Sequence, residues 1–432
     1  MRMSAFRHLS LFVTEGCNLR CDYCFAAPGE HKPVERIIAE RSIEFLLEHA
    51  QEEKSLTIGL WGGEPLLVLP TLKWLVPYAL KKADQHERTL RFSMPTNATL
   101  LTEEAIDFIQ EHAIALSLSI DGTAASQKTR RTLNGKSSFP LVQKKIELLK
   151  KKNLNRLVSV RKTYSPSTVK NLYADIAYFI DHGFNSIAFS PVMEVHWTKR
   201  DMDLCRQEHF RIADRWIEEL ESGNLISFRV WDEVFAAQEL SKTSEILQTL
   251  LWSCGAGISR IAVDVHGDVY PCHRFAFYDR NDKRTKLGNV MTNSDIITPF
   301  QRIDPEAAAQ RTRNCSACSE APICLLFCPA VNYKRTGDIL TNDVGLCGFM
   351  RIAAQVTRYV AGKAGHKRSF QEYIKNRVIP RYVLNPDARF HSSFWNGLSE
   401  KVMNDLVVKT ESLLEGLHAT KEKHEKSRTP HT

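Results

Sequence analysis

The sequence predicts an α/β protein built on a parallel β-sheet, in the form of an open partial barrel of six strand–helix units. Segments rich in Val, Ile, Leu, Phe and Thr alternate with segments of helical periodicity from the start of the chain. This alternation predicts parallel strands joined by right-handed crossovers. Six units are fewer than the eight that close a barrel, so one side of the sheet is expected to stay open. Strands are expected near residues 7–13, 55–61, 89–95, 114–120, 156–162 and 185–191, and helices near residues 34–50, 68–86, 102–112, 138–152, 165–182 and 201–221.

A polar or glycine-containing stretch lies at the end of each expected strand. The carboxyl ends of parallel strands share one edge of a sheet, and folds of this kind place their functional residues there. These stretches are therefore expected to meet at one site, and the open side of the barrel would admit a large substrate such as a peptide. In chain order they are residues 14–25, Gly62-Gly63-Glu64-Pro65, Pro95-Thr96-Asn97, Ser119-Ile120-Asp121-Gly122, Arg161, and Ser190-Pro191-Val192.

The first of these stretches contains Cys17, Cys21 and Cys24 in the spacing Cys-x3-Cys-x2-Cys. Three thiolates can hold three corners of a [4Fe–4S] cube and leave the fourth iron open to a ligand. Zinc sites usually show paired Cys-x2-Cys units and four ligands. The spacing therefore favours an iron–sulfur cluster over zinc.

A second group of cysteines lies between residues 254 and 347. Two short strands around His266-Gly267 predict a hairpin that brings Cys272 back toward Cys254. In a reducing compartment, so many cysteines favour metal ligation over disulfides. Cys205 belongs to neither group; it is either a packed free thiol on a helix or an additional metal ligand. The second group consists of Cys254, Cys272, Cys315, Cys318, Cys324, Cys328 and Cys347.

The composition places the protein in the cytoplasm and concentrates its charge near one end. No apolar run reaches transmembrane length, and the apolar start is better explained as a first strand than as a signal peptide. The net charge is +8, and residues 350–432 carry 15 Lys and Arg against 8 Asp and Glu, a net charge of +7. This basic tail is either a solvated helical surface or a surface that binds an acidic peptide or nucleic acid.

The two cysteine patterns together resemble the radical S-adenosylmethionine (SAM) enzymes that carry a SPASM extension, in particular peptide (RiPP) maturases and anaerobic sulfatase-maturating enzymes. The resemblance covers residues 8–349. It implies a partial (β/α)6 TIM-type barrel over residues 1–221, a linking segment over 222–253 and a SPASM module over 254–349. A basic, mainly helical tail with a disordered end, residues 350–432, would follow.

The resemblance also implies three [4Fe–4S] clusters and SAM as cofactors. One auxiliary cluster would lack an evident fourth ligand, for which water, a substrate thiolate, His273 and Cys205 are candidates. The implied ligands are Cys17, Cys21 and Cys24 for the SAM-binding cluster, Cys315, Cys318, Cys324 and Cys347 for a fully ligated auxiliary cluster, and Cys254, Cys272 and Cys328 for the other.

Several residues are candidates for binding SAM. In the family the GGEP stretch binds the ammonium group, and an aromatic residue at the position of Tyr23 packs on adenine. Polar side chains after the third and fourth strands could bind ribose hydroxyls or simply cap turns. A guanidinium would suit the methionyl carboxylate. The candidates are Tyr23, Gly62, Gly63, Glu64 and Pro65, then Asn97, Ser119 and Asp121 for ribose, and Arg161 for the carboxylate, with Arg130 and Arg131 as alternatives.

His273 is the candidate catalytic residue. The sulfatase-maturating members carry Asp directly after the matching cysteine as a proposed base, whereas this sequence reads Tyr270-Pro271-Cys272-His273. A histidine can also accept a proton, or it can hydrogen-bond to a cluster.

These features predict an enzyme that forms a 5′-deoxyadenosyl radical and abstracts hydrogen from a peptide side chain. The favoured product is a cross-link in a ribosomally synthesised peptide, and the alternative is formylglycine in a sulfatase. From a different class, a zinc-stabilised nucleic-acid binder is the third hypothesis. The expected partners are a precursor peptide and a flavodoxin- or ferredoxin-type electron donor, with no membrane or nucleic acid. A separate peptide-recognition protein is also a candidate, because the cysteine loop begins at residue 14.

Overall fold

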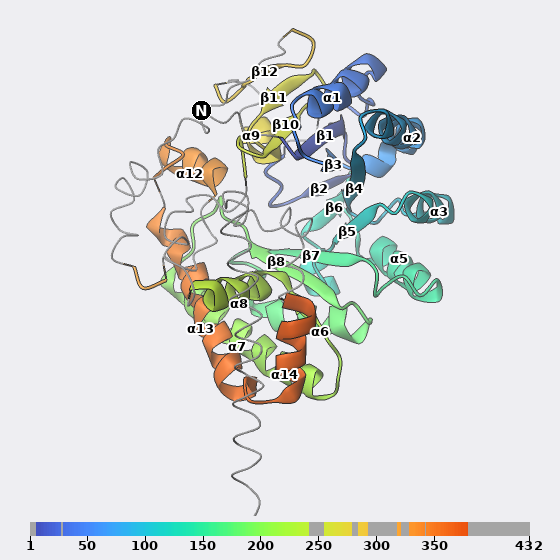
Figure 1. Cartoon of the computed structure of the whole chain (residues 1–432). Helices are drawn as coiled ribbons and strands as arrows, with labels where there is room; N and C mark the ends of the chain where they lie inside the picture. Colours follow the sequence, from blue (N-terminus) through green and yellow to red (C-terminus); the bar gives the residue numbers. More distant parts are fainter. Residues whose placement is uncertain are drawn as a thin grey trace, which may run out of the picture.

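The computed structural model describes residues 6–26, 29–241, 255–278, 284–292, 318–320, 328–341 and 343–378. Its central feature is a ten-stranded mixed sheet (Figure 1) in the order β12-β11-β10-β1-β3-β4-β5-β7-β8-β9. All neighbouring pairs from β10 to β9 are parallel, and the pairs β10–β11 and β11–β12 are antiparallel, so β11 runs against the other strands. The strands are β1 (His8–Thr14), β3 (Ser55–Gly62), β4 (Thr89–Thr96), β5 (Ala115–Ser119), β7 (Ser159–Tyr164), β8 (Ser186–Pro191), β9 (Ser227–Phe228), β10 (Arg260–Val263), β11 (Asp268–Tyr270) and β12 (Gly288–Asn289).

The six predicted strands are β1, β3, β4, β5, β7 and β8, so the predicted α/β class with a mainly parallel sheet is confirmed. The predicted helices are present as well, and two of them begin at a side-chain cap. Thr102 accepts a hydrogen bond from the Ala105 amide at 3.2 Å, and Thr198 forms a capping box with Asp201. The helices that follow the strands are α1 (Arg36–Glu48), α2 (Leu69–Gln85), α3 (Glu103–Glu111), α5 (Phe139–Lys151), α6 (Leu172–Asp181) and α7 (Lys199–Glu221).

Other elements add to this frame. The predicted hairpin is confirmed as β10 and β11, with Gly267 at its turn in a left-handed conformation, φ 80°. A separate two-stranded sheet pairs β2 (Leu19–Cys21) with β6 (Arg130–Thr132). The remaining elements are the α-helices α4 (Ala124–Gln127), α8 (Arg229–Ser241), α9 (His273–Tyr278), α12 (Pro329–Thr336), α13 (Cys347–Ala364) and α14 (Arg368–Tyr373), the short 3-10 helices η1 (Pro65–Val68), η2 (Val169–Asn171) and η6 (Val344–Leu346), and the π-helix η7 (Ile374–Val378).

The segment predicted to be a link, residues 222–253, instead contributes β9 and α8 over the part that the structure describes. β9 pairs with β8, so the parallel sheet extends one strand beyond the six predicted. β10 extends it on the other edge by pairing with β1. Strands of two and four residues are too short to show a period-2 pattern, which explains why they were not predicted as part of this sheet.

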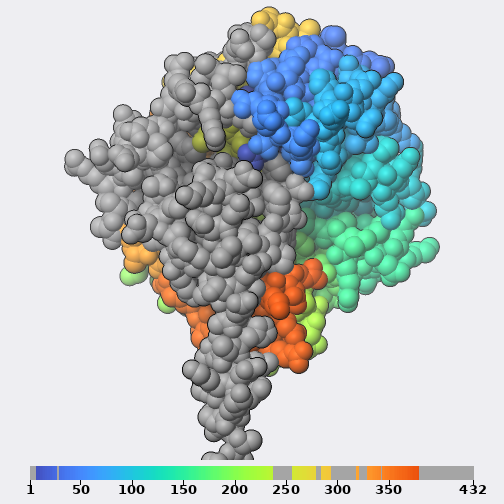
Figure 2. Space-filling model, viewed as in Figure 1, coloured from blue at the N-terminus to red at the C-terminus, as the bar shows by residue number. Residues whose placement is uncertain are grey.

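The first part of the basic tail packs against the helices α7 and α8. Figure 1 shows α13 and α14 beside α7 and α8, and Figure 2 shows them forming the lower end of the described surface. The Tyr373 ring, which is fully buried, lies 5.4 Å from the Trp216 ring, and its hydroxyl donates a hydrogen bond to Asp232. Phe370 packs edge-on against Phe235 at 5.4 Å. Residues up to Val378 are therefore part of the core.

Much of the tail's charge is neutralised within the chain. Residues 350–378 hold seven Lys and Arg and one acidic residue, a net charge of +6 out of the +7 of the tail. Four of the seven pair with carboxylates, which favours a solvated, internally paired surface over a free site for an acidic peptide. The pairs are Arg358–Glu320, Lys363–Asp214, Lys367–Glu221 and Arg368–Glu372. The aromatic run from Tyr382 to Trp395 lies outside the described residues.

Within the described part of the chain, no helix combines the length and the apolar character needed to cross a membrane.

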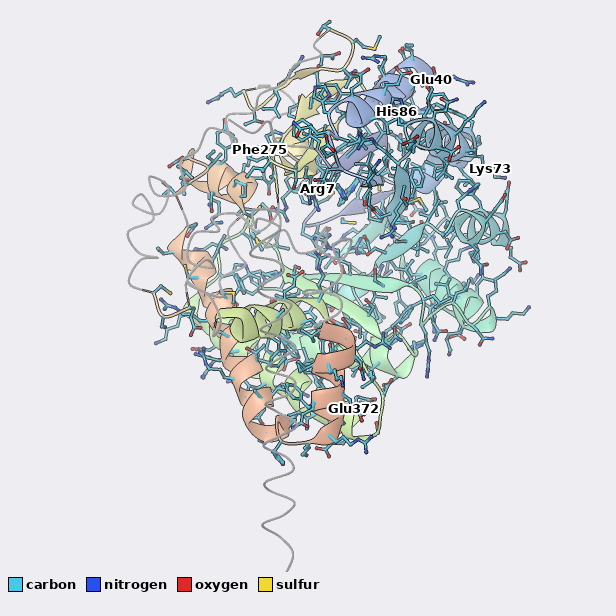
Figure 3. The ribbon with its side chains drawn as sticks, viewed as in Figure 1. Arg7, Glu40, Lys73, His86, Phe275 and Glu372 are labelled. Carbon is cyan, nitrogen blue, oxygen red and sulfur yellow. The ribbon has the colours of Figure 1, made fainter. Side chains whose placement is uncertain are left out.

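Replacing Tyr373 with Ala should lower the free energy of unfolding by about 3–5 kcal/mol, because a buried aromatic site is emptied. Urea unfolding of the full chain measures this. Glu372→Ala is the matched control: Glu372 is the preceding residue on α14 (Figure 3) and forms only an exposed pair with Arg368, so its loss should cost no more than about 0.5 kcal/mol. Equal effects of the two substitutions would show that the tail does not belong to the core.

Candidate functional site

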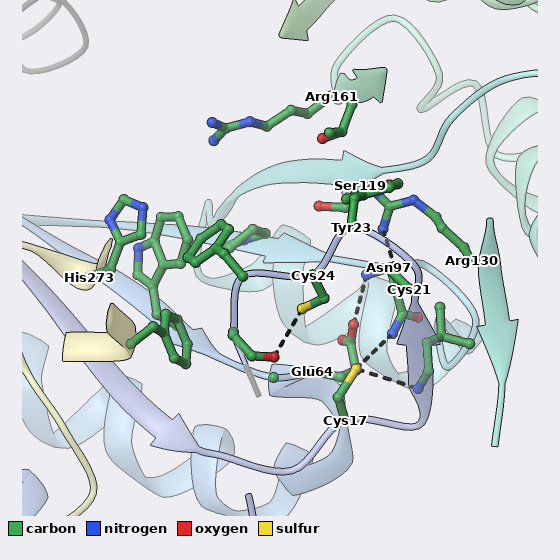
Figure 4. Close-up of a pocket in the computed structure, with 18 of the residues that line it drawn as sticks. Cys17, Cys21, Tyr23, Cys24, Glu64, Asn97, Ser119, Arg130, Arg161 and His273 are labelled. Carbon is green, nitrogen blue, oxygen red and sulfur yellow. Dashed lines mark hydrogen bonds between the residues drawn. The ribbon is translucent and has the colours of Figure 1, made fainter. Parts of the chain in front are cut away.

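A cavity of about 210 Å³ lies at the carboxyl ends of the strands. Each of the six polar stretches predicted from the sequence contributes to its lining, as the parallel topology requires (Figure 4). Pro65, Asp121 and Arg131 do not line it. The candidate residues that do are Cys17, Cys21, Tyr23, Cys24, Gly62, Gly63, Glu64, Asn97, Ser119, Arg130, Arg161 and His273.

Two glycines at the end of β3 allow the cysteine loop to pack against the sheet. A Cβ on Gly63 would lie 2.2 Å from the Gly16 carbonyl oxygen and 2.8 Å from Cys17 Cβ. A Cβ on Gly62, whose φ is 154°, would lie 2.2 Å from the Thr14 oxygen. In their place, backbone hydrogen bonds join the two segments, such as Glu64 N–H to Gly16 O at 2.8 Å. The glycines are required by this close approach.

Glu64 is fully buried, and its carboxylate already accepts three hydrogen bonds. The donors are the Thr96 hydroxyl at 2.6 Å, the Asn97 amide at 2.7 Å and the Leu66 amide at 3.1 Å. Burial nevertheless raises the pKa of Glu64, because desolvation outweighs these bonds. The carboxylate thus joins the ends of β3 and β4 beneath the cavity. Pro65 starts η1, where the missing N–H costs nothing, and has a structural role.

The other side of the cysteine loop is held by Asp121, which is 1% exposed. One carboxylate oxygen accepts from the Tyr23 hydroxyl at 2.5 Å and pairs with the Arg130 guanidinium at 3.1 Å. The other accepts from the Thr163 amide at 3.1 Å. These bonds favour the structural alternative over ribose binding for Asp121, because its carboxylate is used by protein donors and does not line the cavity.

A buried ion pair supports Asp121 from behind. Lys162 and Asp175 are both fully buried, with Nζ 2.7 Å from the carboxylate. Lys162 also donates to the Asp121 carbonyl oxygen at 2.8 Å. Asp175 accepts from Thr123 and from the Ser126 hydroxyl, at 2.9 and 2.5 Å. The loop after β5 is therefore fixed by charge-assisted hydrogen bonds in the core.

The three cysteine thiols line one wall of the cavity. Burial, with a smaller contribution from the charge of Cys24, raises the pKa of Cys17 to about 11 and that of Cys21 to about 12. Such thiols become thiolates when a metal centre supplies positive charge. Arg130 Nη1 lies 4.0 Å from Cys21 Sγ, which suits a negatively charged ligand set. The residues therefore fit an iron–sulfur cluster, although no three metal-binding side chains in the described ranges are already arranged as a site.

Of the three arginines considered for binding the methionyl carboxylate, Arg161 is the one that pairs with no carboxylate among the described residues. Arg130 is committed to Asp121, and Arg131 pairs with Asp22 at 3.0 Å outside the cavity. In the described part of the structure Arg161 forms no ion pair, and it is exposed along the cavity that it lines. Desolvation by the surrounding protein, followed by the charges of nearby arginines, lowers its pKa to about 10. Figure 4 shows its guanidinium above the cysteine loop, extended toward the side where His273 lies. An anion there would relieve the positive charge.

The two remaining polar candidates differ in availability. The Asn97 side chain is engaged: its oxygen accepts from the Thr99 hydroxyl at 2.6 Å and its nitrogen donates to Asn18 at 2.9 Å. This favours the turn-capping alternative. Ser119 lines the cavity and forms no side-chain hydrogen bond within the residues described, so it stays a candidate for a ligand hydroxyl.

His273 lies across the cavity and stacks on Trp61, with ring centroids 4.0 Å apart and planes at 16°. Burial and the nearby arginines lower the pKa of His273 well below its ordinary value, so the ring is neutral. Its Nδ1 forms no hydrogen bond with any of the residues that the structure describes. Trp61 was missed by the sequence analysis; its position directly before Gly62 was the available signal.

The sequence analysis also missed a group of side chains around Arg274, which lies on the same side of the cavity as His273. Arg274 pairs with Glu194, from the loop after β8, and donates to the Tyr278 hydroxyl at 2.6 Å. Its guanidinium also lies 4.6 Å from the centre of the Phe25 ring, in the cysteine loop. One side chain thus connects α9 to two loops of the sheet.

The second cysteine group is only partly described. Burial and then the charge of Cys328 raise the pKa of Cys272 to about 11, and both residues belong to one packed group of side chains. Their assignment to one iron–sulfur cluster stays a prediction. Cys347 begins α13. Cys205 is fully buried with Sγ 3.7 Å from the Tyr164 hydroxyl, which supports the packed-thiol alternative. Cys254, Cys315 and Cys324 lie outside the described residues.

Comparison with known sequences gives a family for the first part of the chain. Residues 11–166 match the Radical SAM superfamily. The uncharacterized protein MJ0907 of Methanocaldococcus jannaschii is 29% identical over 187 residues, which cover 43% of this chain and 63% of that protein. A cysteine-type anaerobic sulfatase-maturating enzyme of Clostridium perfringens is 24% identical over 310 residues, 67% of this chain and 80% of the enzyme.

Solved structures share the fold. Native anSMEcpe with bound AdoMet and Kp18Cys peptide aligns with a TM-score of 0.66 at 20% identity, over 85% of this chain and 99% of that one. Streptococcus suis SuiB bound to precursor peptide SuiA aligns with a TM-score of 0.53 at 16% identity, over 79% and 76%. With three cysteines in the predicted spacing at the cavity, these findings agree with the sequence: the chain contains a radical SAM domain, over residues 11–166.

Proposed function

We propose that this chain is a radical SAM enzyme that oxidatively modifies a side chain of a peptide or protein. The observation that carries the proposal is a single cavity lined by three cysteine thiols on one side and by Arg161 and His273 on the other. The names of relatives add support, since several are sulfatase-maturating enzymes and one structural neighbour was solved with a precursor peptide.

The thiols of Cys17, Cys21 and Cys24 would hold a [4Fe–4S] cluster beside SAM. When bound, the cluster and SAM supply a carbon radical that removes hydrogen from an unactivated carbon. The backbone at Gly62 and Gly63 would contact the ammonium end of SAM. Arg161 would bind the carboxylate end, because it faces the cavity without a carboxylate partner among the described residues.

The opposite wall would orient the substrate carbon. Trp61 and His273 present stacked rings, and Phe277 adds an apolar surface that excludes water. Oxidation of the substrate releases a proton, and Nδ1 of the neutral His273 ring is available to accept it. Two auxiliary clusters, held by the cysteines between 254 and 347, would accept the electron that the substrate loses after the hydrogen has been removed.

Two products are compatible with this site. A cross-link in a ribosomally synthesised peptide remains the favoured product, because His273 stands where the sulfatase-maturating relatives carry Asp. Formylglycine is the alternative, favoured by the printed names of several relatives.

Replacing Cys17, Cys21 and Cys24 together with Ala should remove about four irons per chain and abolish reductive SAM cleavage, because three ligands of one cluster are lost. Iron analysis and chromatography of 5′-deoxyadenosine after anaerobic reconstitution measure both. Cys205→Ala, a buried thiol away from the cavity, is the control and should keep its full iron content. Deoxyadenosine formation by the triple variant would contradict the assignment.

Arg161→Ala should weaken SAM binding roughly ten- to a hundredfold, the effect of losing a charge-assisted hydrogen bond of about 1.5–3 kcal/mol. Equilibrium titration with SAM measures the dissociation constant. Arg131→Ala removes an arginine outside the cavity and should bind SAM like the unmodified protein. Unchanged affinity in Arg161→Ala would move the carboxylate site to Arg130.

Mass spectrometry of products decides between the two reactions. The enzyme is incubated with SAM, a reductant and either the small peptide encoded beside its gene or a sulfatase-derived peptide that carries Cys or Ser. A cross-linked product should lose two hydrogens and fail to react with hydrazine, whereas formylglycine should form a hydrazone. Deoxyadenosine formation with neither peptide changed would overturn the peptide-modifying proposal.

A further inference from the structure

The outer side of the cysteine loop carries a short hairpin, residues 128–138. β2 and β6 pair so that Cys21 stands opposite Arg130, and the Asp22 amide donates to the Thr129 oxygen at 2.9 Å. Arg130 turns inward to within 4.0 Å of Cys21 Sγ, whereas the side chain of Arg131 is 51% exposed. At this hairpin the inward-facing Arg130 side chain therefore lies between the Cys21 thiol and the exposed surface that Arg131 forms.

This surface is positively charged. Arg20, Lys128 and Lys136 are exposed and form no ion pair with any carboxylate in the ranges that the structure describes. Arg20 donates only to backbone oxygens of its own loop, those of Cys17 and Leu19. The segments around β2 and the hairpin thus carry four exposed cations, the fourth being Arg131, and one carboxylate, Asp22, which pairs with Arg131. Unlike the basic residues of α13 and α14, most of these cations pair with no carboxylate among the residues that the structure describes.

An apolar side chain lies among these cations. Leu133, in the turn of the hairpin, is 56% exposed. An apolar contact surrounded by charges of one sign is the arrangement by which proteins bind partners of opposite charge transiently.

We propose that this basic surface, formed by Arg20, Lys128, Arg131, Leu133 and Lys136, docks an acidic one-electron carrier protein. The inference rests on the proposed function, because reductive cleavage of SAM consumes one electron per turnover. The carrier loses one electron and the cluster site held by Cys17, Cys21 and Cys24 gains one, with no transfer of atoms. Charge complementarity selects an acidic carrier and raises its rate of association.

The position of the surface leaves the cavity accessible. Arg20, Lys128, Arg131 and Lys136 are all absent from the cavity lining, which faces α9 and the loop after β8 instead. A carrier bound at the hairpin therefore does not occupy the space that the peptide needs. Electron entry and substrate entry are assigned to different faces.

The test is a double charge reversal, Lys128→Glu with Lys136→Glu, in the reconstituted full chain. The probe is a flavodoxin, an acidic carrier, and its dissociation constant is measured by titration at low and at high salt. The double variant should bind at least about tenfold more weakly at low salt, and binding to the unmodified protein should weaken as salt rises. Lys81→Glu, an exposed lysine on α2, is the matched control and should keep its affinity within about twofold.

A second measurement separates this inference from the proposed function. Dithionite is small and needs no docking surface, so dithionite-driven SAM cleavage should be equal in all three proteins, while flavodoxin-driven cleavage should fall in the double variant alone. Failure of SAM cleavage with dithionite in the unmodified protein would count against the proposed function, and the titration would still decide the docking surface. Unchanged flavodoxin affinity in the double variant, or an equal loss in Lys81→Glu, would overturn the docking proposal.

Discussion

The buried ion pair between Lys162 and Asp175 is the interaction on which the cavity depends. Both side chains are fully buried, and removing one partner of such a pair typically costs about 3–5 kcal/mol because the other charge is left uncompensated. From this pair, hydrogen bonds continue outward through Asp121 to the Tyr23 hydroxyl. The cysteine loop, which is short and exposed on its outer side, is thus positioned by a charge pair deep between the strands and α6.

The opposite wall of the cavity has a different origin. Its α9 part lies more than two hundred positions after the cysteine loop and reaches the cavity because β10 pairs with β1 at the edge of the sheet. The hairpin that follows directs α9 across the strand ends, and Arg274 then fastens α9 to Glu194 and to the ring of Phe25. Edge pairing and one multiply bonded arginine therefore bring His273 to face the three thiols.

The sequence alone predicted those parts of the site that depend on the periodicity of apolar residues and on the spacing of the cysteines. Six strands, the edge at which their loops meet and the cysteine pattern were all predictable, because each is a regular repeat or a fixed spacing. Whether a polar side chain faces a ligand was not predictable. Asp121 and Glu64 look alike as carboxylates after strands, yet both are occupied by protein donors that only the folded structure brings near. The same limit applies to Glu194 and Arg274, whose pairing spans 80 positions of the chain.

The tight glycine contacts beneath the cavity also constrain how such a site can diversify. At Gly62 and Gly63 a single added methyl group would collide with backbone atoms of the cysteine loop, so this wall cannot change by ordinary substitution without separating the loop from the sheet. The wall built from α9 and the loop after β8 consists of side chains, which can be exchanged without moving the backbone. New substrate preferences in proteins of this architecture can therefore evolve on one wall while the radical-generating wall stays fixed.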